Sequence, residues 1–281
     1  MKLVIHIGIH KTGTSALQGF LHTNRERLRD RGIWYEPPEG HKNHTLRVFE
    51  FRPGETYSPD AFRARLNVAA DEGCPVYLMS SEVFVQRPFD IEAFAHSIDG
   101  FETEVIAYLR APDDFVVSAY NQTVRGKNAR TIPLRDKIGP DPTYRRQLSN
   151  WMRSQWELTL APYDRKQWPN GSIFLDFLSM LHVLPDGLDI EPRQDDENRS
   201  LPAPLIEVLR AANIVGIAGE QRVSLIRELR ELGRSRPDLY PEAELLTAAE
   251  RRAYRAIFAE HVEAYRPFYR PGFDETFLLP S

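Results

Sequence analysis

The stretch Ile5–Leu21 constrains the fold of this chain more than any other, because it joins an apolar run to a glycine-rich turn and then to a helical pattern. The run Leu3–Ile7 predicts a short buried strand, and apolar residues recur at helical spacing from Leu17 onward. The free N–H groups and the positive end of the new helix then face the turn. We therefore expect an anion site there.

The expected turn contains residue types suited to such a site, namely Gly8, His10, Lys11, Thr12, Gly13, Thr14 and Ser15. Gly13 lets the backbone come close to a ligand without a Cβ in the way. Successive backbone N–H groups can then converge on one point. The expected ligand is a phosphate or a group of similar shape.

The spacing within the turn argues against an ordinary ATP or GTP site. Gly8 and Gly13 are separated by four residues, as in nucleoside triphosphate loops, but Thr14 stands where those loops have lysine. Lys11 lies three positions earlier and would reach an anion from another side. A turn rich in glycine and threonine can also follow a strand without binding anything.

Strands and helices are expected to alternate along residues 1–185. The expected strands are Leu3–Ile7, Ile33–Tyr35, Pro75–Met79, Thr103–Leu109 and Ser172–Leu175. The expected helices are Thr14–Arg31, Asp60–Asp71, Ile91–Ile98, one opening at Pro112, Leu148–Leu160, Pro202–Ala212, Glu220–Leu232 and Thr247–Tyr265, the last with a capping box. This order predicts a single α/β domain, 1–281, with a central parallel sheet flanked by helices and a helical part, 186–281, that covers it. Its ligands should lie beyond the carboxyl ends of the strands.

Composition excludes several classes of function. The net charge of -4 gives no electrostatic reason for nucleic-acid binding, and no apolar run approaches the roughly 18 residues of a membrane span. Cys74 is the only cysteine, which suits a reducing compartment, and no zinc-ligand spacing occurs. With a first strand starting at Leu3 and no room for a signal peptide, we expect a cytoplasmic protein.

A second group of anion-binding residues is expected at the end of the strand Thr103–Leu109. Arg110 ends this strand and Ser118 lies in the following helix, so that the two could share one phosphate. The two groups lie about a hundred residues apart in sequence but at carboxyl ends of strands in the same sheet. They predict a ligand with two separate anionic groups.

These residues resemble the motifs of sulfotransferases that use 3'-phosphoadenosine 5'-phosphosulfate. The family's first motif is a strand, turn and helix with lysine inside the turn, and His10–Gln18 is similar to the version common in bacterial members. Its second motif is an arginine at a strand end, a serine eight residues later and often a tyrosine, which Arg110, Ser118 and Tyr120 match. The resemblance implies a P-loop-like three-layer fold, and it weakens after about residue 185.

The resemblance also implies roles for individual residues. Lys11 would contact the 5'-phosphosulfate and stabilise charge on the leaving phosphate, while His10 shapes the loop or touches substrate. The backbone of Thr12–Ser15 would cradle the phosphosulfate, with Gly13 open to it and the hydroxyls of Thr14 and Ser15 adding hydrogen bonds. Arg110 and Ser118 would hold the 3'-phosphate. The product would be adenosine 3',5'-bisphosphate, and no metal would be needed.

Three residues are candidates for the general base, a glutamate and two histidines. Glu82 follows the strand Pro75–Met79 beside the turn, whereas His41 and His44 lie in a long loop. The family's third cofactor segment, rich in glycine and lysine, is absent as such, and Asn198, Arg199 and Ser200 are a possible substitute.

The acceptor is expected to be a hydroxyl or amine of a small molecule or carbohydrate. The basic segment Arg125–Arg146 permits an acidic glycan, and Trp151, Trp156 and the aromatic residues near Phe49 and Phe51 permit an apolar or sugar ring. One alternative is a phosphotransferase with an irregular P-loop, which needs Mg²⁺ and for which Asp176 is the nearest ligand. Another is a non-catalytic nucleotide-binding protein on the same fold. The sequence leaves the oligomeric state open.

Overall fold

The computed structural model describes residues 1–52, 58–86, 89–136, 141–190, 201–239 and 244–280. The chain forms two compact units, each assembled from separate stretches of sequence. The first unit comprises residues 1–110, 144–194 and 262–275, and the second comprises residues 111–143, 195–261 and 276–281. The expectation of a single domain 1–281 stays a prediction.

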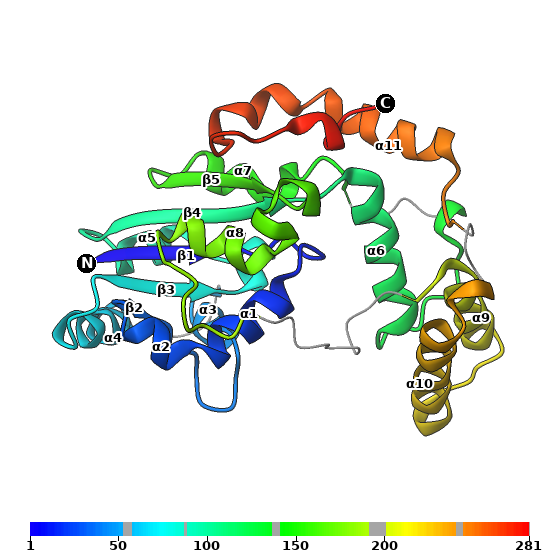
Figure 1. The fold of residues 1–281 in the computed structure, drawn as a ribbon, viewed down its shortest axis with the longest axis horizontal. Coiled ribbons are helices and arrows are strands. Elements are labelled where there is room, and N and C mark those ends of the chain that lie inside the picture. Colours follow the sequence, from blue (N-terminus) through cyan, green and yellow to red (C-terminus); the bar gives the residue numbers. More distant parts are fainter. Residues whose placement is uncertain (53–57, 87–88, 137–140, 191–200, 240–243, 281) are drawn as a thin grey trace. The chain divides into compact units, whose positions relative to one another are not determined.

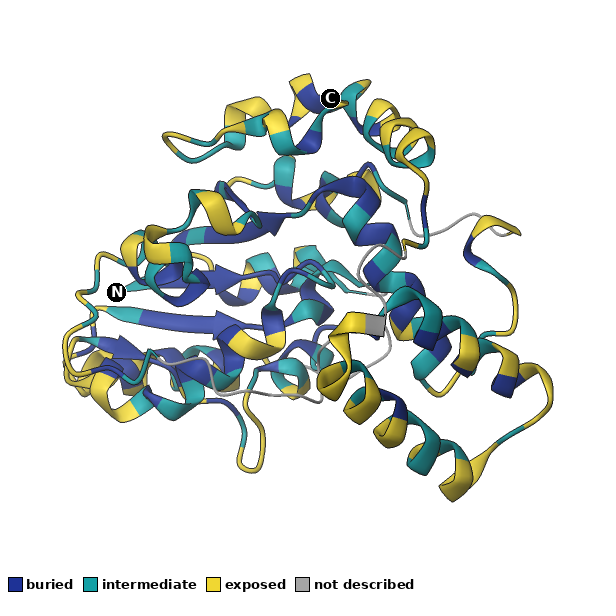
Figure 2. Cartoon of the chain, turned by 45° about the vertical axis from the view of Figure 1, so that its right-hand side comes forward, coloured by how far each residue is buried: buried dark blue, intermediate teal, exposed yellow. Residues whose placement is uncertain are grey.

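The first unit is built on a five-stranded sheet in which every described pairing is parallel (Figure 1). The strands, in the order β2-β3-β1-β4-β5, are Ile33–Trp34, Val76–Ser80, Lys2–His6, Glu102–Leu109 and Glu157–Pro162. The strands are almost wholly buried, which Figure 2 shows in dark blue, because helices cover both faces of a parallel sheet. The predicted α/β class with a parallel sheet flanked by helices is confirmed.

Helices connect the strands of the first unit. They are α1 (Thr14–Thr23), α2 (Arg25–Arg29), α3 (Thr45–Phe49), α4 (Pro59–Asp71), the 3₁₀ helix η1 (Glu82–Val85), α5 (Ile91–Ser97), α7 (Arg145–Met152) and α8 (Ile173–Met180). One core joins Val4 and Leu78 of the sheet to Leu17 of α1 and Phe177 of α8. These contacts fix the start of α1 over the carboxyl end of β1.

Aromatic side chains form a second cluster, carried by α4, η1, α5, α7 and the residues that follow α3. Phe84, Phe94 and Trp151 pack edge to face with centroid separations of 5.5 to 5.8 Å, geometry that aromatic quadrupoles favour. Phe51 and Phe62 extend this cluster toward α4. Trp151 and Phe51 are only 2% and 1% exposed, so both serve the core and offer no ring to an acceptor.

Two of the predicted elements between residues 148 and 180 are wrong. The predicted strand Ser172–Leu175 is the start of helix α8, where the Ser172 hydroxyl accepts a hydrogen bond from Leu175 N and caps the helix. The predicted helix Leu148–Leu160 ends as α7 at Met152, and the chain then forms β5. Short apolar runs do not distinguish a buried helix from a buried strand, and here the pairing of β5 with β4 decides.

The predicted helix Thr14–Arg31 is two helices, α1 and α2, separated at Asn24. The Asn24 side chain donates to the Phe20 carbonyl and to the Asp189 carbonyl, and its Oδ1 accepts from Asp189 N. A buried asparagine that bonds a distant segment interrupts the helix, because its hydrogen bonds compete with the helical ladder.

The second unit is helical, which confirms the expected helical C-terminal part. Its α-helices are α6 (Pro112–Arg125), α9 (Ala203–Ile214), α10 (Gly219–Ser235) and α11 (Ala248–Ala259). The predicted capping box at Thr247 and Glu250 is confirmed. Within the described residues, no helix has both the length and the apolar content that crossing a membrane requires.

Candidate functional site

The turn from Ile7 to Gly13 joins β1 to α1 and has an unusual backbone. Lys11 has φ 71° and Gly13 has φ 72°, both in the left-handed region. A lysine in that region costs about 1–2 kcal/mol relative to a right-handed conformation, so surrounding contacts must hold it there. Strain of this kind gathers at ligand-binding turns.

The first backbone N–H groups of α1 lie directly after this turn. Leu17 N donates the first helical bond, to the Gly13 carbonyl, so the N–H groups of Thr14, Ser15 and Ala16 have no acceptor within the helix. With the positive end of the helix dipole they form the kind of site that binds phosphate.

The hydroxyls of the turn divide into structural and open ones. Thr12 is fully buried and its Oγ1 donates to the Ile9 carbonyl at 2.6 Å. Thr14 Oγ1 lies 3.4 Å from the same carbonyl. Ser15 is exposed. The Thr12 hydroxyl therefore braces the turn, whereas Ser15 lies exposed in the first turn of α1.

Both glycines of the turn are required by close packing. A Cβ at position 8 would lie 2.5 Å from Thr14 Cγ2. A Cβ at position 13 would lie 3.0 Å from Tyr163 Cε2 and 3.2 Å from Ile173 Cδ1. Tyr163 thus forms one wall of the turn.

Arg110, at the end of β4, contacts the turn directly. Its Nη1 donates to the Lys11 carbonyl at 2.8 Å, and its guanidinium lies 5.4 Å from the centre of the Tyr163 ring. Tyr144 Oη in turn donates to the Arg110 carbonyl. Arg110 thus contacts the turn and supports the left-handed Lys11, while the anion-binding roles predicted for these residues stay predictions.

Ser118 lies on α6, in the second unit, and is 7% exposed. Tyr120, on the same helix, is buried and its hydroxyl donates to Glu207. The shared phosphate of Arg110 and Ser118 stays a prediction, because the two residues belong to different units.

The carboxyl end of β3 lies next to the turn, since Ser81 N donates to the His6 carbonyl of β1. Glu82 opens η1 there and is partly buried. Gln18, from α1, donates through Nε2 to Ser80 Oγ at 3.2 Å and to Glu82 Oε2 at 3.3 Å. Asn43 Nδ2 donates to Gln18 Oε1, which fixes the orientation of this amide. Glu82 is thus held by a buried glutamine.

His10 faces the same region. Its Nε2 lies 3.0 Å from Gln86 Nε2, just after η1. Burial lowers the pKa of His10, an effect that the Glu82 carboxylate opposes and Lys11 reinforces. His10 is therefore mainly neutral near pH 7 and can share a hydrogen bond with Gln86.

The two histidines that compete with Glu82 lie in different environments. His44 is fully buried, its Nδ1 accepts from Ser80 N, and burial lowers its pKa to about 3. A buried neutral histidine in this position supports the end of β3. His41 is exposed. His6, which the sequence analysis did not single out, is also fully buried and bonds Ser80 Oγ through Nδ1 at 2.8 Å.

Asp176 is fully buried and already paired. It accepts from Tyr108 Oη at 2.8 Å and from Arg270 Nη1 at 2.5 Å. Its carboxylate therefore has two strong partners and is turned away from solvent. Within the part of the chain that the structure describes, no group of histidine, cysteine or acidic side chains could hold a metal ion. The proposed substitute for the third motif, Asn198–Ser200, lies outside the described residues.

Three residues that contact the candidate site were missed by the sequence analysis, namely Gln18, Gln86 and Tyr163. Gln18 lies at a position of α1 that helical spacing places beside Leu17 and Leu21, on the buried side. A polar residue on the buried face of the helix that follows the turn was a usable signal. Gln86 and Tyr163 carry no comparable signal, because only the fold brings them to the turn.

Comparisons with known proteins add one relative. No model of a known protein family matches the sequence, and no solved structure matches it. A protein of Archaeoglobus fulgidus, described as uncharacterized, is 28% identical over 165 residues. That alignment covers 56% of this chain and 44% of the archaeal protein, so the chain matches less than half the length of this relative.

Proposed function

We propose that this protein is a sulfotransferase that moves a sulfuryl group from 3'-phosphoadenosine 5'-phosphosulfate to a hydroxyl or amine. The observation that carries the proposal is the position of Lys11, inside a left-handed turn whose carbonyl is held by Arg110. Such a lysine approaches an anion at the start of α1 from within the turn. A lysine on the helix itself, as in nucleoside triphosphate loops, would approach from the other side.

In the proposed reaction the acceptor oxygen or nitrogen attacks sulfur while the bond between sulfur and the 5'-phosphate oxygen breaks. The acceptor proton goes to the Glu82 carboxylate, which Gln18 orients. Negative charge grows on the departing phosphate, where Lys11 and the N–H groups of Thr14–Ala16 stabilise it. Arg110 would hold the second anionic group of the nucleotide. The expectation of a cytoplasmic protein belongs to this proposal, since the sulfuryl donor is a nucleotide.

The phosphotransferase alternative has less support from this geometry. Phosphoryl transfer needs Mg²⁺ held by an acidic side chain. The residue expected to serve, Asp176, is buried and paired with Tyr108 and Arg270. A non-catalytic nucleotide-binding protein would keep the turn but would not need Gln18 to orient Glu82.

Binding of adenosine 3',5'-bisphosphate tests the proposal. A ligand that binds only the native state raises the free energy of unfolding, by about 2.7 kcal/mol at a hundredfold excess over Kd, and so raises the melting temperature. We expect this nucleotide to raise it more than ATP with Mg²⁺, and adenosine 5'-monophosphate to give a smaller shift because it lacks the 3'-phosphate. A larger shift with ATP and Mg²⁺ would favour the phosphotransferase, and no shift with the bisphosphate would refute the proposal.

A further inference from the structure

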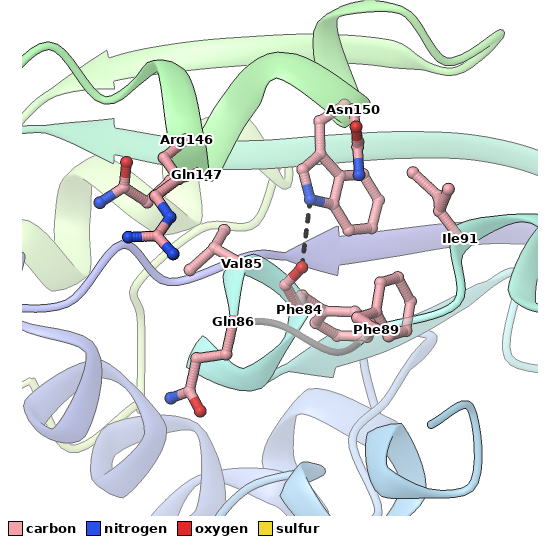
Figure 3. Close-up of a pocket in the computed structure, with 9 residues that line it drawn as sticks. Phe84, Val85, Gln86, Phe89, Ile91, Arg146, Gln147 and Asn150 are labelled. Atoms are coloured by element: carbon pink, nitrogen blue, oxygen red, sulfur yellow. Dashed lines mark hydrogen bonds between the residues drawn. The ribbon is translucent and has the colours of Figure 1, made fainter. Parts of the chain in front are cut away.

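A small pocket of about 30 Å³ lies between η1 and α7 (Figure 3). Phe84, Val85 and Gln86 form one side, and Arg146, Gln147 and Asn150 of α7 form the other. Trp151 Nε1 donates to the Phe84 carbonyl and joins the two walls at the base. Every lining residue belongs to the first unit.

The pocket adjoins the candidate transfer site. One wall is η1, the element that Glu82 opens. Gln86 lies in the same wall, and its side chain points away from α7 (Figure 3). There it contacts His10, which precedes Lys11. A group held in the pocket is therefore connected to the turn through a single side chain.

Two groups in the pocket lack a partner. Among the residues that the structure describes, no carboxylate pairs with the exposed Arg146, and the lining residues include no acid. Gln147 Oε1 is buried and accepts no hydrogen bond from any described residue. The side chains of Arg146 and Gln147 lie together at one end of the pocket (Figure 3). A buried acceptor without a donor is costly, so a ligand that donates to it gains binding energy.

These two groups specify complementary chemistry. The planar guanidinium matches a carboxylate with two parallel hydrogen bonds. A single cation balances one negative charge, which favours a carboxylate over a doubly charged phosphate. Gln147 Oε1 needs an O–H or N–H donor from the same molecule. The small volume admits a functional group and not a whole ring.

We propose that this pocket binds the carboxylate end of the acceptor, and that the acceptor is a hydroxylated carboxylate such as a sugar acid. Its carboxylate pairs with Arg146, a hydroxyl donates to Gln147 Oε1, and another hydroxyl extends toward Glu82. This inference rests on the proposed function for the identity of the reaction, but the binding itself can be tested without transfer.

The test measures binding of D-glucuronate and D-glucose, which differ in the carboxylate, to the full chain by calorimetry. A second pair, lactate and lactamide, repeats the comparison on a smaller frame. We expect each carboxylate to bind about tenfold more tightly than its neutral partner, with the difference lost in Arg146→Gln and reduced in Arg146→Lys. Gln147→Leu should weaken both members of a pair. Arg27→Gln, which removes an equal charge from an exposed position on α2, should leave the difference intact.

Equal binding of the carboxylate and its neutral partner in both pairs would overturn the inference, as would a preference that survives Arg146→Gln. Each titration is repeated with saturating adenosine 3',5'-bisphosphate. Binding of the nucleotide without any carboxylate preference would leave the proposed function standing and refute the pocket. A preference that depends on Arg146 in a protein that does not bind the nucleotide would support the pocket and refute the proposed function.

Discussion

The turn between β1 and α1 is defined by its left-handed backbone, which Thr12 and Arg110 brace through backbone carbonyls, whereas the neighbouring end of β3 is held by hydrogen bonds between side chains. In the turn, Lys11 and Gly13 both have left-handed backbone conformations. At β3, Gln18 bonds both Ser80 and Glu82. The turn should therefore respond to changes in backbone geometry, and the end of β3 to the loss of single hydrogen bonds.

The largest expected effect is the loss of the Lys11 side chain. Lys11→Ala should lower sulfuryl transfer by about 10³-fold, since a fixed cation at the leaving group acts mainly in the transition state. Lys11→Gly should lose as much activity as Lys11→Ala. Its free energy of unfolding should be about 1 kcal/mol higher than that of Lys11→Ala, because glycine adopts a φ of 71° without strain. Transfer assays and urea unfolding measure the two effects separately. Equal stability of the two variants would contradict the strained turn.

Glu82→Gln should lower kcat by about 10²-fold, because it removes the group that we propose accepts the proton. The affinity for adenosine 3',5'-bisphosphate should not change, since the proposed nucleotide site lies on the side of the turn. Glu72→Gln neutralises an exposed carboxylate that follows α4 and serves as the matched control. A weaker affinity for the nucleotide in Glu82→Gln would show that Glu82 contributes to nucleotide binding, and the turn and the end of β3 would then not have separate roles.

Gly13→Ala tests the backbone conformation of the turn, and Gly73→Ala is a matched control in the same unit. Gly73 has φ 75°, close to the 72° of Gly13, but a Cβ there would meet no atom within 4 Å. Both substitutions should cost about 1–2 kcal/mol of stability, from the left-handed backbone. Gly13→Ala should also weaken binding of the bisphosphate about tenfold, because the Cβ displaces Tyr163 and the turn. If calorimetry finds unchanged binding of the bisphosphate in Gly13→Ala, the turn is not the nucleotide-binding site.

Gln18→Met should lower kcat about tenfold with little change in affinity for the nucleotide, through the loss of one hydrogen bond that orients Glu82. A double-mutant cycle distinguishes orientation from general damage. In the Glu82→Gln background, Gln18→Met should cause no further loss of kcat, since the two residues act as a unit. An equal loss in both backgrounds would assign Gln18 to the fold alone.

The effect on activity at neutral pH is smallest for the buried histidines, which concern acid stability. Burial lowers the pKa of His6 and of His44 to about 3, so both stay neutral in the folded protein while the unfolded chain takes up protons below its ordinary pKa near 6.5. Stability should then fall as the pH drops from 6.5 toward 3, by about 1.4 kcal/mol per pH unit for each histidine. His6→Asn, which can keep a hydrogen bond to Ser80, should reduce this slope by the contribution of one histidine, about 1.4 kcal/mol per pH unit. Urea unfolding across this range would show an unchanged slope if His6 were not buried and neutral.

Much of the fold followed from local pattern, and the exceptions have a common cause. Strands β1, β3 and β4 were predicted within one or two residues because each is an apolar run bounded by turn residues. The segment 148–180 was predicted wrongly because the apolar residues of Ile173–Met180 fit either a strand or a helix. Only the pairing of Glu157–Pro162 with β4 decided which segment completed the sheet.

The sequence by itself determined the turn, its two glycines and the displaced Lys11, because backbone conformation and spacing are local properties. It also indicated Arg110 and Glu82, since parallel strands bring their carboxyl ends to one edge. Tertiary structure alone decided that Arg110 donates to the Lys11 carbonyl, that Gln18 orients Glu82, and that Arg146 and Gln147 share a pocket beside η1. These contacts join residues up to about a hundred positions apart, and their geometry depends on how helices pack on the sheet, which no local pattern records.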